Sequence, residues 1–442
     1  MHTKLLKLNN ISGLQLFQFF RYGSLMLVSI LLTKFGLSIQ EIGLYESLLL
    51  VAGFISFFWI SGIIQTLLPL FQNNKTFTLS SKKSPEIFNA AILLFLFSFL
   101  SAIVLYTFKS QIINLISDNT NMQYFNLFIL YMIVASPTHL IEYIYLLKNK
   151  AKQIVYYGII NFLLQVILVA IPLILNFEFV YVLWAMIIWM SFRLIWLFFL
   201  LRKYAQFTIS IKFIIEHLQI AFPLILSTLL SGSAQYIDGI IVTSFFDESA
   251  FAVFRYGARE FPIVLLMANA FSNAIIPEFS QQEKIETVLD KIKKNTKNFI
   301  HILFPLTIII LIISNFAFPI IYNRDFTLSA KVFNIYLLLI ISRLVFPQTI
   351  LIGLKKTKII LLAALIEIIL NISLSILLVY FYGIIGVAFA TVIAYFFEKL
   401  FLIIYLQTKS ISLKTYIPLG IYTFYSLVLL LVYIIIDYVI YI

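Results

Sequence analysis

Long apolar runs separated by short polar segments make up almost the entire chain. A membrane-spanning helix needs about 20 mostly apolar residues, and thirteen runs in the 442 residues reach this length. We expect the spans at 11–33, 42–71, 86–108, 123–147, 153–175, 179–202, 216–245, 250–278, 298–322, 330–354, 358–382, 384–407 and 416–441. The pattern therefore predicts an all-α, polytopic membrane protein.

Composition agrees with this prediction and excludes several kinds of chemistry. Hydrophobic residues make up 62% of the chain and charged residues only 11%. Cysteine is absent, which excludes disulfides and thiolate chemistry, and the four histidines show no metal-ligand spacing. We therefore expect no cofactor and no metal site. The first apolar run has no small-residue cleavage site, so we expect no cleavable signal peptide.

The formal net charge of +12 would favour nucleic acid as a partner of a soluble protein. Here the distribution of the basic residues explains it. With the N-terminus in the cytoplasm, twenty-one basic residues fall inside and four outside, namely Lys34, Lys109, Arg324 and Lys331. This asymmetry follows the positive-inside rule and predicts no nucleic-acid partner. The other six lie within spans: Arg21, Arg193, Arg255, Arg259, Arg343 and Lys399.

The longest connection, residues 280–298, has apolar residues at helical spacing with lysines between them. We expect it to lie on the cytoplasmic surface as an amphipathic helix. No outer loop is long enough to fold as a domain, which disfavours membrane glycosyltransferases and polysaccharide polymerases.

The two halves of the chain repeat each other at an offset of about 206 to 210 residues. QTLLPLF at 65–71 matches NAIIPEF at 273–279, and LKNKAK at 147–152 matches GLKKTK at 353–358. Six spans per copy give both copies one orientation, with a cavity between the lobes. We therefore expect six-helix lobes at 1–205 and 206–410, and an additional transmembrane helix at 411–442.

FRYG at 20–23, a second FRYG followed by AREFP at 254–262, and the paired prolines resemble the polysaccharide and O-antigen flippases. This is the lipid-linked oligosaccharide branch of the superfamily that includes MATE exporters and the lipid II flippase. The resemblance covers about residues 10 to 408. It implies a V-shaped transporter with alternating access, whose first, second, seventh and eighth spans line a central cavity. A thirteenth span departs from the family's usual twelve or fourteen.

Within the apolar stretch 235–279, five charged residues fall inside the predicted spans, and charge at that depth costs at least a few kcal/mol per group. They are Asp238, Arg255, Arg259, Glu260 and Glu278. On a helix, Arg255 and Arg259 would share one face. Two guanidinium forks on one wall suit a phosphate.

We expect the arginines to bind the pyrophosphate of a polyprenyl-linked glycan, with two adjacent tyrosines stacking on its sugars. The predicted substrate contacts are Arg21, Arg255, Arg259, Arg343, Tyr22 and Tyr256. The structural alternative is pairing within the protein. Eight acids lie in or at the ends of spans: Glu46, Glu142, Asp238, Glu260, Glu278, Glu367, Glu398 and Asp437.

Three acidic residues are candidates for gating or ion coupling. Glu46 and Arg255 occupy equivalent repeat positions with opposite charge, and we expect them to pair across the closed cavity mouth, or else each to pair within its own lobe. Asp238 and Glu260 are candidates for H⁺ or Na⁺ coupling. The alternative is that they hold Arg255 or Arg259 in place.

The sequence thus predicts a non-enzymatic flippase in the bacterial inner membrane that moves a lipid-linked O-antigen or other surface polysaccharide unit, as in lipopolysaccharide synthesis. Its partners would be the substrate, membrane lipids and other polysaccharide assembly proteins. The alternative is an ion-coupled exporter of small cationic or amphipathic compounds. A membrane enzyme acting on polyprenyl phosphates would need converging Asp or His residues at one membrane face, and the sequence has no such cluster.

Overall fold

The computed structural model describes residues 10–73, 83–116, 124–279 and 285–441. In these ranges the regular structure is helical, and thirteen helices are long and apolar enough to cross a membrane. The all-α class and the number of spans are therefore confirmed.

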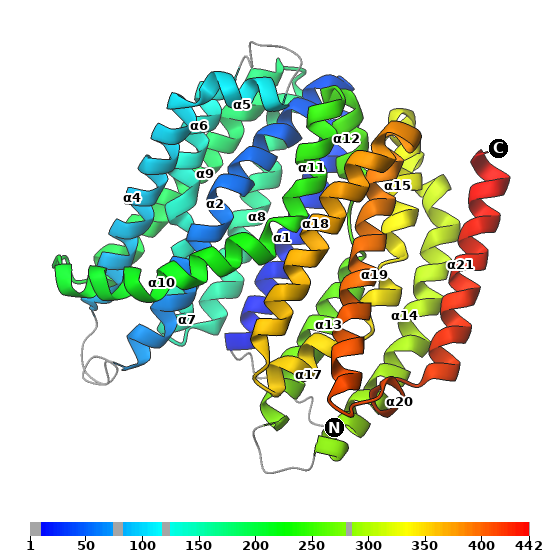
Figure 1. The fold of residues 1–442 in the computed structure, drawn as a ribbon. Coiled ribbons are helices and arrows are strands. Elements are labelled where there is room, and N and C mark those ends of the chain that lie inside the picture. Colours follow the sequence, from blue (N-terminus) through cyan, green and yellow to red (C-terminus); the bar gives the residue numbers. More distant parts are fainter. Residues whose placement is uncertain (1–9, 74–82, 117–123, 280–284, 442) are drawn as a thin grey trace, which may run out of the picture. The chain divides into compact units, whose positions relative to one another are not determined.

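The chain divides into two compact units, the first ending at Ser233 and the second beginning at Ala234. The first unit runs from blue to green in Figure 1 and contains α1 (Asn10–Lys34), α2 (Ile39–Asn73), α4 (Pro85–Thr107), α5 (Lys109–Ile116), α6 (Phe125–Ala135), η1 (Ser136–Leu140), α7 (Ile141–Leu147), α8 (Ala151–Ile174), α9 (Phe179–Tyr204) and α10 (Ile211–Gly232). Helix α10 packs across α2 and α4. The predicted lobe boundary at 205/206 follows the repeat, and that division remains a prediction.

The second unit runs from green to red in Figure 1. It contains α11 (Ala234–Phe245), α12 (Glu248–Gly257), α13 (Pro262–Ile275), η2 (Ile276–Phe279), α14 (Ile285–Ile321), η3 (Arg324–Phe326), α15 (Thr327–Leu337), α16 (Ile340–Arg343), α17 (Pro347–Gly353), α18 (Thr357–Tyr382), α19 (Ile384–Thr408), α20 (Leu413–Tyr416) and α21 (Leu419–Tyr441). The additional C-terminal helix is thus present as α21, and it packs against α14.

The sequence predicted one continuous helix at 216–245 and another at 250–278. Both predictions are wrong, because each range contains two helices. The first is divided at Ser233 into α10 and α11. In the second, α12 ends at Gly257 and α13 begins at Pro262. A proline has no backbone N–H and disfavours the helical conformation in the residue before it. Phe261 is accordingly extended, with φ −64° and ψ 110°.

The fourth span of each repeat is also interrupted. In the first unit the 3-10 segment η1, which contains Pro137, separates α6 from α7. In the second unit the chain leaves α16 at Arg343 and starts α17 at Pro347. Transporters place functional groups at such breaks, where the backbone is released from helical hydrogen bonding. In the second unit, the break at 258–261 contains Glu260, and the break at 344–346 directly follows Arg343.

Helix α14 merges two elements that the sequence predicted separately. The amphipathic segment and the span at 298–322 form one helix of 37 residues, about 55 Å long and so longer than the roughly 30 Å hydrocarbon core. Three of the four apolar positions behind the amphipathic pattern, Val288, Leu289 and Ile292, are buried, whereas the fourth, Ile285, is exposed. The place of this segment on the cytoplasmic surface remains a prediction. Residues 280–284 lie outside the described residues.

A glycine fixes the crossing of α12 and α15 beside the first of these breaks. A Cβ atom on Gly257 would overlap the backbone oxygen of Ser329 and the side chain of Val332. The same crossing is held by the Ser329 hydroxyl, which donates to the Val253 carbonyl oxygen at 2.6 Å. The end of α12 therefore depends on the absence of a side chain at residue 257.

We predict that Gly257→Ala lowers the free energy of unfolding by about 1–3 kcal/mol, the range for overpacking a filled interior. Gly420→Ala is the matched control, because nothing lies within 4 Å of a Cβ atom there. Thermal unfolding of the two variants in detergent measures the difference. Equal midpoints would show that the crossing tolerates a side chain.

Candidate functional site

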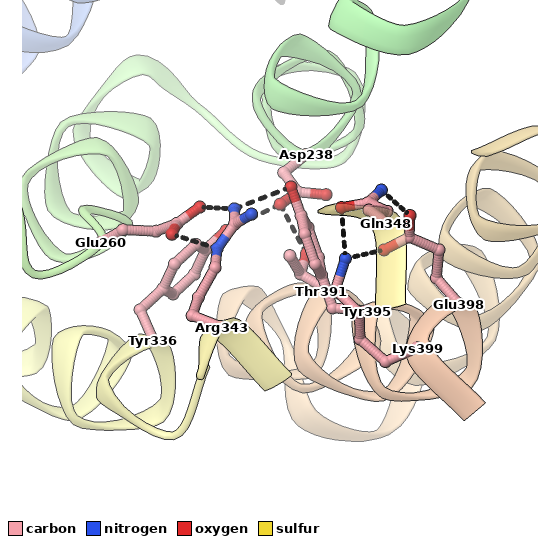
Figure 2. A network of polar contacts seen from close by, with 9 residues as sticks. All are labelled: Asp238, Glu260, Tyr336, Arg343, Gln348, Thr391, Tyr395, Glu398 and Lys399. Carbon is pink, nitrogen blue, oxygen red and sulfur yellow. Dashed lines mark hydrogen bonds and ion pairs between the residues drawn. The ribbon is translucent and has the colours of Figure 1, made fainter. Parts of the chain in front are cut away.

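A polar network lies inside the second unit (Figure 2). It joins α11, the break after α12, α15, α16, α17 and α19 through nine side chains: Asp238, Glu260, Tyr336, Arg343, Gln348, Thr391, Tyr395, Glu398 and Lys399. The chain thus gathers charged and hydroxyl groups from residues more than 150 positions apart.

Arg343 and Glu260 form a two-pronged ion pair within this network. The arginine Nε donates to Glu260 Oε2 at 2.8 Å, and Nη2 donates to Oε1 at 2.5 Å. Nη2 also donates to the Tyr395 hydroxyl at 3.0 Å, and the guanidinium lies 4.4 Å from the centre of the Tyr395 ring. A bidentate pair of this kind is among the stronger polar contacts in proteins.

This geometry changes two of the predicted roles. Arg343 was expected to contact substrate, but its guanidinium is already matched to a carboxylate. Glu260 was expected to couple ions or to hold Arg255 or Arg259, but it pairs with Arg343. We therefore leave both out of the proposed substrate and ion contacts.

Lys399 is neutralised in the same way. Its Nζ donates to Glu398 Oε2 at 2.9 Å and to Gln348 Oε1 at 2.8 Å, while Gln348 Nε2 donates to Glu398 Oε1 at 2.6 Å. The three groups form a closed ring of buried polar contacts. Pairing within the protein, the structural alternative for the eight acids, thus describes Glu398.

Asp238 differs from these acids because no basic side chain is hydrogen-bonded to it in the described residues. Its Oδ2 accepts hydrogen bonds from the Tyr336 hydroxyl at 2.7 Å and the Thr391 hydroxyl at 2.5 Å. Its Oδ1 is buried and has no hydrogen-bond partner in the described part of the chain. A buried, unpartnered carboxylate oxygen is costly unless it is protonated or bound to a cation.

The surroundings of Asp238 are rich in oxygen. The Thr391 hydroxyl lies 3.1 Å from the Val387 carbonyl oxygen and accepts from Asn371 Nδ2 at 3.1 Å. The Ser375 hydroxyl lies 3.4 Å from Asn371 Oδ1. Oxygen atoms of this kind are the ligands that hard cations prefer.

The charges around Asp238 also favour a bound proton or cation. Glu367 is buried close enough to Asp238 and Glu398 to interact with both, and its Oε1 has no hydrogen-bond partner among the described residues. The four ionised acids Asp238, Glu260, Glu367 and Glu398 would carry −4, against +2 for Arg343 and Lys399. With all four acids ionised the site would be short of two positive charges, which protons or a cation would have to supply.

The arginines of α12 do not share one helix face, so that prediction is wrong. Arg255 is half-buried in the last turn of α12, whereas Arg259 lies beyond the end of the helix. The Arg259 backbone N–H donates to the Gly257 carbonyl oxygen at 2.7 Å, in a turn. The two arginines lie on different sides of the end of α12, because the helix is interrupted before Pro262.

The two tyrosines predicted to stack on sugars differ in exposure. Tyr256 is fully buried, with its ring stacked on Phe326 at 4.7 Å and tilted against Tyr322 at 5.1 Å, so no face is open to a sugar. That prediction is withdrawn. Tyr22 on α1 is 38% exposed and stays a candidate.

Arg21 lies beside Tyr22 in the first unit. Its guanidinium is 5.6 Å from the centre of the Tyr22 ring, and its buried Nε has no hydrogen-bond partner among the described residues. The same part of α1 is held to α8 by the Ser24 hydroxyl, which donates to Gln165 at 3.0 Å. Glu46 is buried on α2. Glu46 and Arg255 belong to different units, and their pairing remains a prediction.

Sequence reasoning missed the hydroxyl groups Tyr336, Thr391 and Tyr395. No local pattern marks them, because the charged residues to which they are bonded, Asp238 and Arg343, lie between 52 and 153 residues away. The one available signal was Asn371, a polar residue in the middle of an apolar span, which the repeat aligns with Gln165.

Comparison with known proteins identifies the family. Residues 31–331 match the family described as "Polysaccharide biosynthesis protein". A comparison with curated protein sequences finds no match.

Solved structures with the same fold include the lipid II flippase MurJ in an inward closed conformation, with a TM-score of 0.71, 18% identity, and coverage of 96% of this chain and 92% of that one. A multidrug resistance MATE transporter of the MOP superfamily, inward-facing, has a TM-score of 0.67 at 13% identity, with 92% and 99% covered. A MOP superfamily transporter from Pyrococcus furiosus, described as having a binding pocket of reverse polarity, has a TM-score of 0.59 at 13% identity, with 94% and 99% covered.

At these identities the structures establish a shared fold, and the family match adds the sequence relationship. The matched segment covers more than half of the chain. The resemblance seen in the FRYG and proline motifs is thereby confirmed at the level of the family. The protein belongs to the polysaccharide biosynthesis protein family and has the fold of the lipid II flippase and the MATE transporters of the MOP superfamily.

Proposed function

We propose that the protein is a flippase, which moves a polyprenyl-pyrophosphate-linked oligosaccharide from the cytoplasmic to the outer leaflet by alternating access. No covalent bond of the substrate changes in this process. The family match and the fold support the proposal, and Arg21 is the observation that carries it.

Arg21 is suited to an anionic lipid head by its depth and by what surrounds it. It is the twelfth of the 25 residues of α1, about 16–20 Å from either end of that helix. No carboxylate forms an ion pair with it in the described residues, in contrast to Arg343 and Lys399. A guanidinium at mid-membrane depth without an anion is unfavourable, and a pyrophosphate would supply two phosphoryl groups for its fork.

The neighbourhood of Arg21 also suits a large, amphipathic substrate. Tyr22 is exposed on α1, and its ring lies beside the Arg21 guanidinium. A ring in that position can pack against the apolar face of a sugar while the arginine binds the phosphate.

The second unit would couple this movement to a cation. Na⁺ or H⁺ at Asp238 would satisfy the bare Oδ1 and reduce the negative excess of the network. Because Asp238 bonds to side chains of α15 and α19, a bound cation would favour the arrangement in which these helices are held together. A cation shifts the balance between two conformations only if it binds one of them more tightly than the other.

An exporter of small organic cations is the second candidate, and the negative excess of the second unit is the observation that favours it. Asp238 is only 6% exposed and its Oδ1 is enclosed. This space suits an inorganic cation or a proton better than an organic one. We therefore assign the excess charge to the coupling ion.

The cellular setting follows from the same proposal. The protein would lie in the bacterial cytoplasmic membrane with its N-terminus inside, since the basic residues concentrate on that side. Its cargo would be an O-antigen or another surface polysaccharide unit, as in lipopolysaccharide synthesis, and the proteins that build and polymerise that glycan would be its partners.

We predict that Arg21→Gln lowers the rate of flipping by about 10- to 100-fold, because hydrogen bonds to a charged group contribute about 1.5–3 kcal/mol. The assay uses proteoliposomes containing a fluorescent polyprenyl-pyrophosphate oligosaccharide, and a lectin added outside reports the flipped glycan. Arg21→Lys should retain part of the rate, since the charge remains without the fork.

Arg202→Gln is the matched control, because Arg202 is an exposed arginine at the end of α9 in the same unit. It should leave the rate unchanged. A full rate in Arg21→Gln would remove the basis of the proposal. Transport of a small organic cation in place of the lipid would favour the exporter.

Asp238→Asn should abolish the response of flipping to an imposed cation gradient, because the amide keeps the shape but loses the negative charge. Separate sodium and pH gradients across the same proteoliposomes distinguish Na⁺ from H⁺. Asp247→Asn is the control: Asp247 accepts a hydrogen bond from the Ala250 N–H at 2.9 Å as the N-cap of α12, and Asn caps a helix equally well. If Asp238→Asn responded to both gradients like the unaltered protein, the coupling site would lie elsewhere.

A further inference from the structure

The first unit contains a buried arginine that forms no ion pair in the described residues. Arg193 on α9 is only 6% exposed. Its Nε donates to the Tyr157 hydroxyl at 2.9 Å, its Nη1 lies 3.7 Å from Met190 Sδ, and its guanidinium is 5.6 Å from the centre of the Trp189 ring. None of these groups is an anion at neutral pH.

A buried carboxyl group lies on the neighbouring helix. Glu142 on α7 is 5% exposed, and its Oε2 has no hydrogen-bond partner within the described ranges. Helices α7 and α9 pack against each other, and Glu142 and Arg193 are close enough to interact electrostatically. Two buried groups that would attract each other as ions are therefore present but not bonded.

The protonated form of Glu142 accounts for this arrangement. An ionised carboxylate with a bare oxygen in the protein interior costs several kcal/mol, whereas a neutral carboxyl group costs far less. Once ionised, Glu142 would attract the guanidinium, because a direct pair would offset much of the burial cost of both charges.

The internal repeat provides a comparison within the same chain. At an offset of 206 residues, Arg193 corresponds to Lys399 and Glu142 corresponds to Gln348. In the second unit that contact is formed, with Lys399 Nζ donating to Gln348 Oε1 at 2.8 Å. Gln348 has the shape of a protonated glutamate but cannot release a proton. Glu398, which supplies the negative charge beside Lys399, corresponds to Phe192.

We propose that Glu142 is a proton-binding site of the first unit, whose carboxyl group releases its proton when it pairs with Arg193. The site is separate from the Asp238 site of the second unit. It does not depend on which substrate the protein carries.

Other titratable or charged groups surround α7 and must be distinguished from Glu142. They are Arg21 on α1, Glu46 on α2, Tyr131 on α6, His139 on η1, Tyr143 and Tyr145 on α7 itself, Tyr157 on α8 and Arg193 on α9. Of these only Glu46 is a carboxyl group. A measurement specific for protonated carboxyl groups therefore excludes His139 and the tyrosines.

The contacts of Arg193 connect this site to the helix that contains Arg21. The Tyr157 ring, whose hydroxyl accepts from Arg193, stacks on Phe17 of α1 at 5.8 Å with an angle of 11° between the rings. Phe17 is 1% exposed and lies one helical turn before Arg21. When Arg193 moves to Glu142, Tyr157 loses its hydrogen bond, and the packing that holds α1 changes. Proton release would thus alter the position of the proposed anion-binding residue.

Infrared spectroscopy of the full chain in lipid nanodiscs tests the proposal. The carbonyl stretch of a protonated carboxyl group is recorded at neutral pH and again after the pH is raised. We expect Glu142→Gln to remove one carboxyl equivalent per chain, both in the unaltered protein and in an Asp238→Asn background. Glu86→Gln is the control, because the buried Glu86 accepts a hydrogen bond from the Ser84 hydroxyl at 2.5 Å near the start of α4. It should leave the signal unchanged.

A spectrum of Glu142→Gln identical to that of the parent protein would overturn the proposal. Should this variant fail to fold, Glu142→Asp keeps the carboxyl group in a different environment and must shift the band; an unshifted band also contradicts the assignment. The readout requires no substrate, so it remains decisive even if the flippase proposal fails.

Discussion

The burial of charge at membrane depth is the constraint on which the rest of this structure depends. Each buried ionic group must find an opposite charge, a proton or a ligand, because the surroundings offer little solvation. In the second unit, Arg343 and Lys399 each bond to a carboxylate, and Asp238 and Glu367 remain without a basic partner in the described residues. In the first unit, Arg21 and Arg193 form no ion pairs among the described residues. The two units therefore differ in how their buried basic residues are balanced: those of the second unit are bonded to carboxylates, whereas Arg21 and Arg193 of the first are not.

The helix breaks make the second-unit network possible. A continuous helix hydrogen-bonds its own backbone and fixes each side chain by its 3.6-residue period. The break before Pro262 places Glu260 outside any helix, and the break before Pro347 begins directly after Arg343, the last residue of α16. Between these two positions the pair forms both of its hydrogen bonds. The close crossing at Gly257 then fixes where α12 ends. The geometry of the polar network therefore depends on Gly257, Glu260 and Arg343.

The sequence predicted the thirteen spans and the family because hydrophobic length and the paired motifs are local signals. It did not predict the breaks, because a proline within an apolar run is compatible with a kinked helix. Arg255 and Arg259 show the consequence: four residues apart, they were assigned to one face of a helix that ends between them. The partners of Arg343, Asp238 and Arg193 are distant in sequence, so only the folded chain could identify them. The repeat did contain one usable signal, the alignment of Glu142 with Gln348. That signal could be interpreted only once the structure showed Gln348 bonded to Lys399 in the second unit.

The central claim is that the first unit provides the cation for an anionic lipid head while the second binds the coupling ion. An experimental structure with a bound polyprenyl-pyrophosphate oligosaccharide tests it most directly. The account predicts density for the pyrophosphate within hydrogen-bonding distance of the Arg21 guanidinium, with the Arg343–Glu260 pair intact. Pyrophosphate bound to Arg343 in place of Glu260, with Arg21 making no contact to it, would contradict the account.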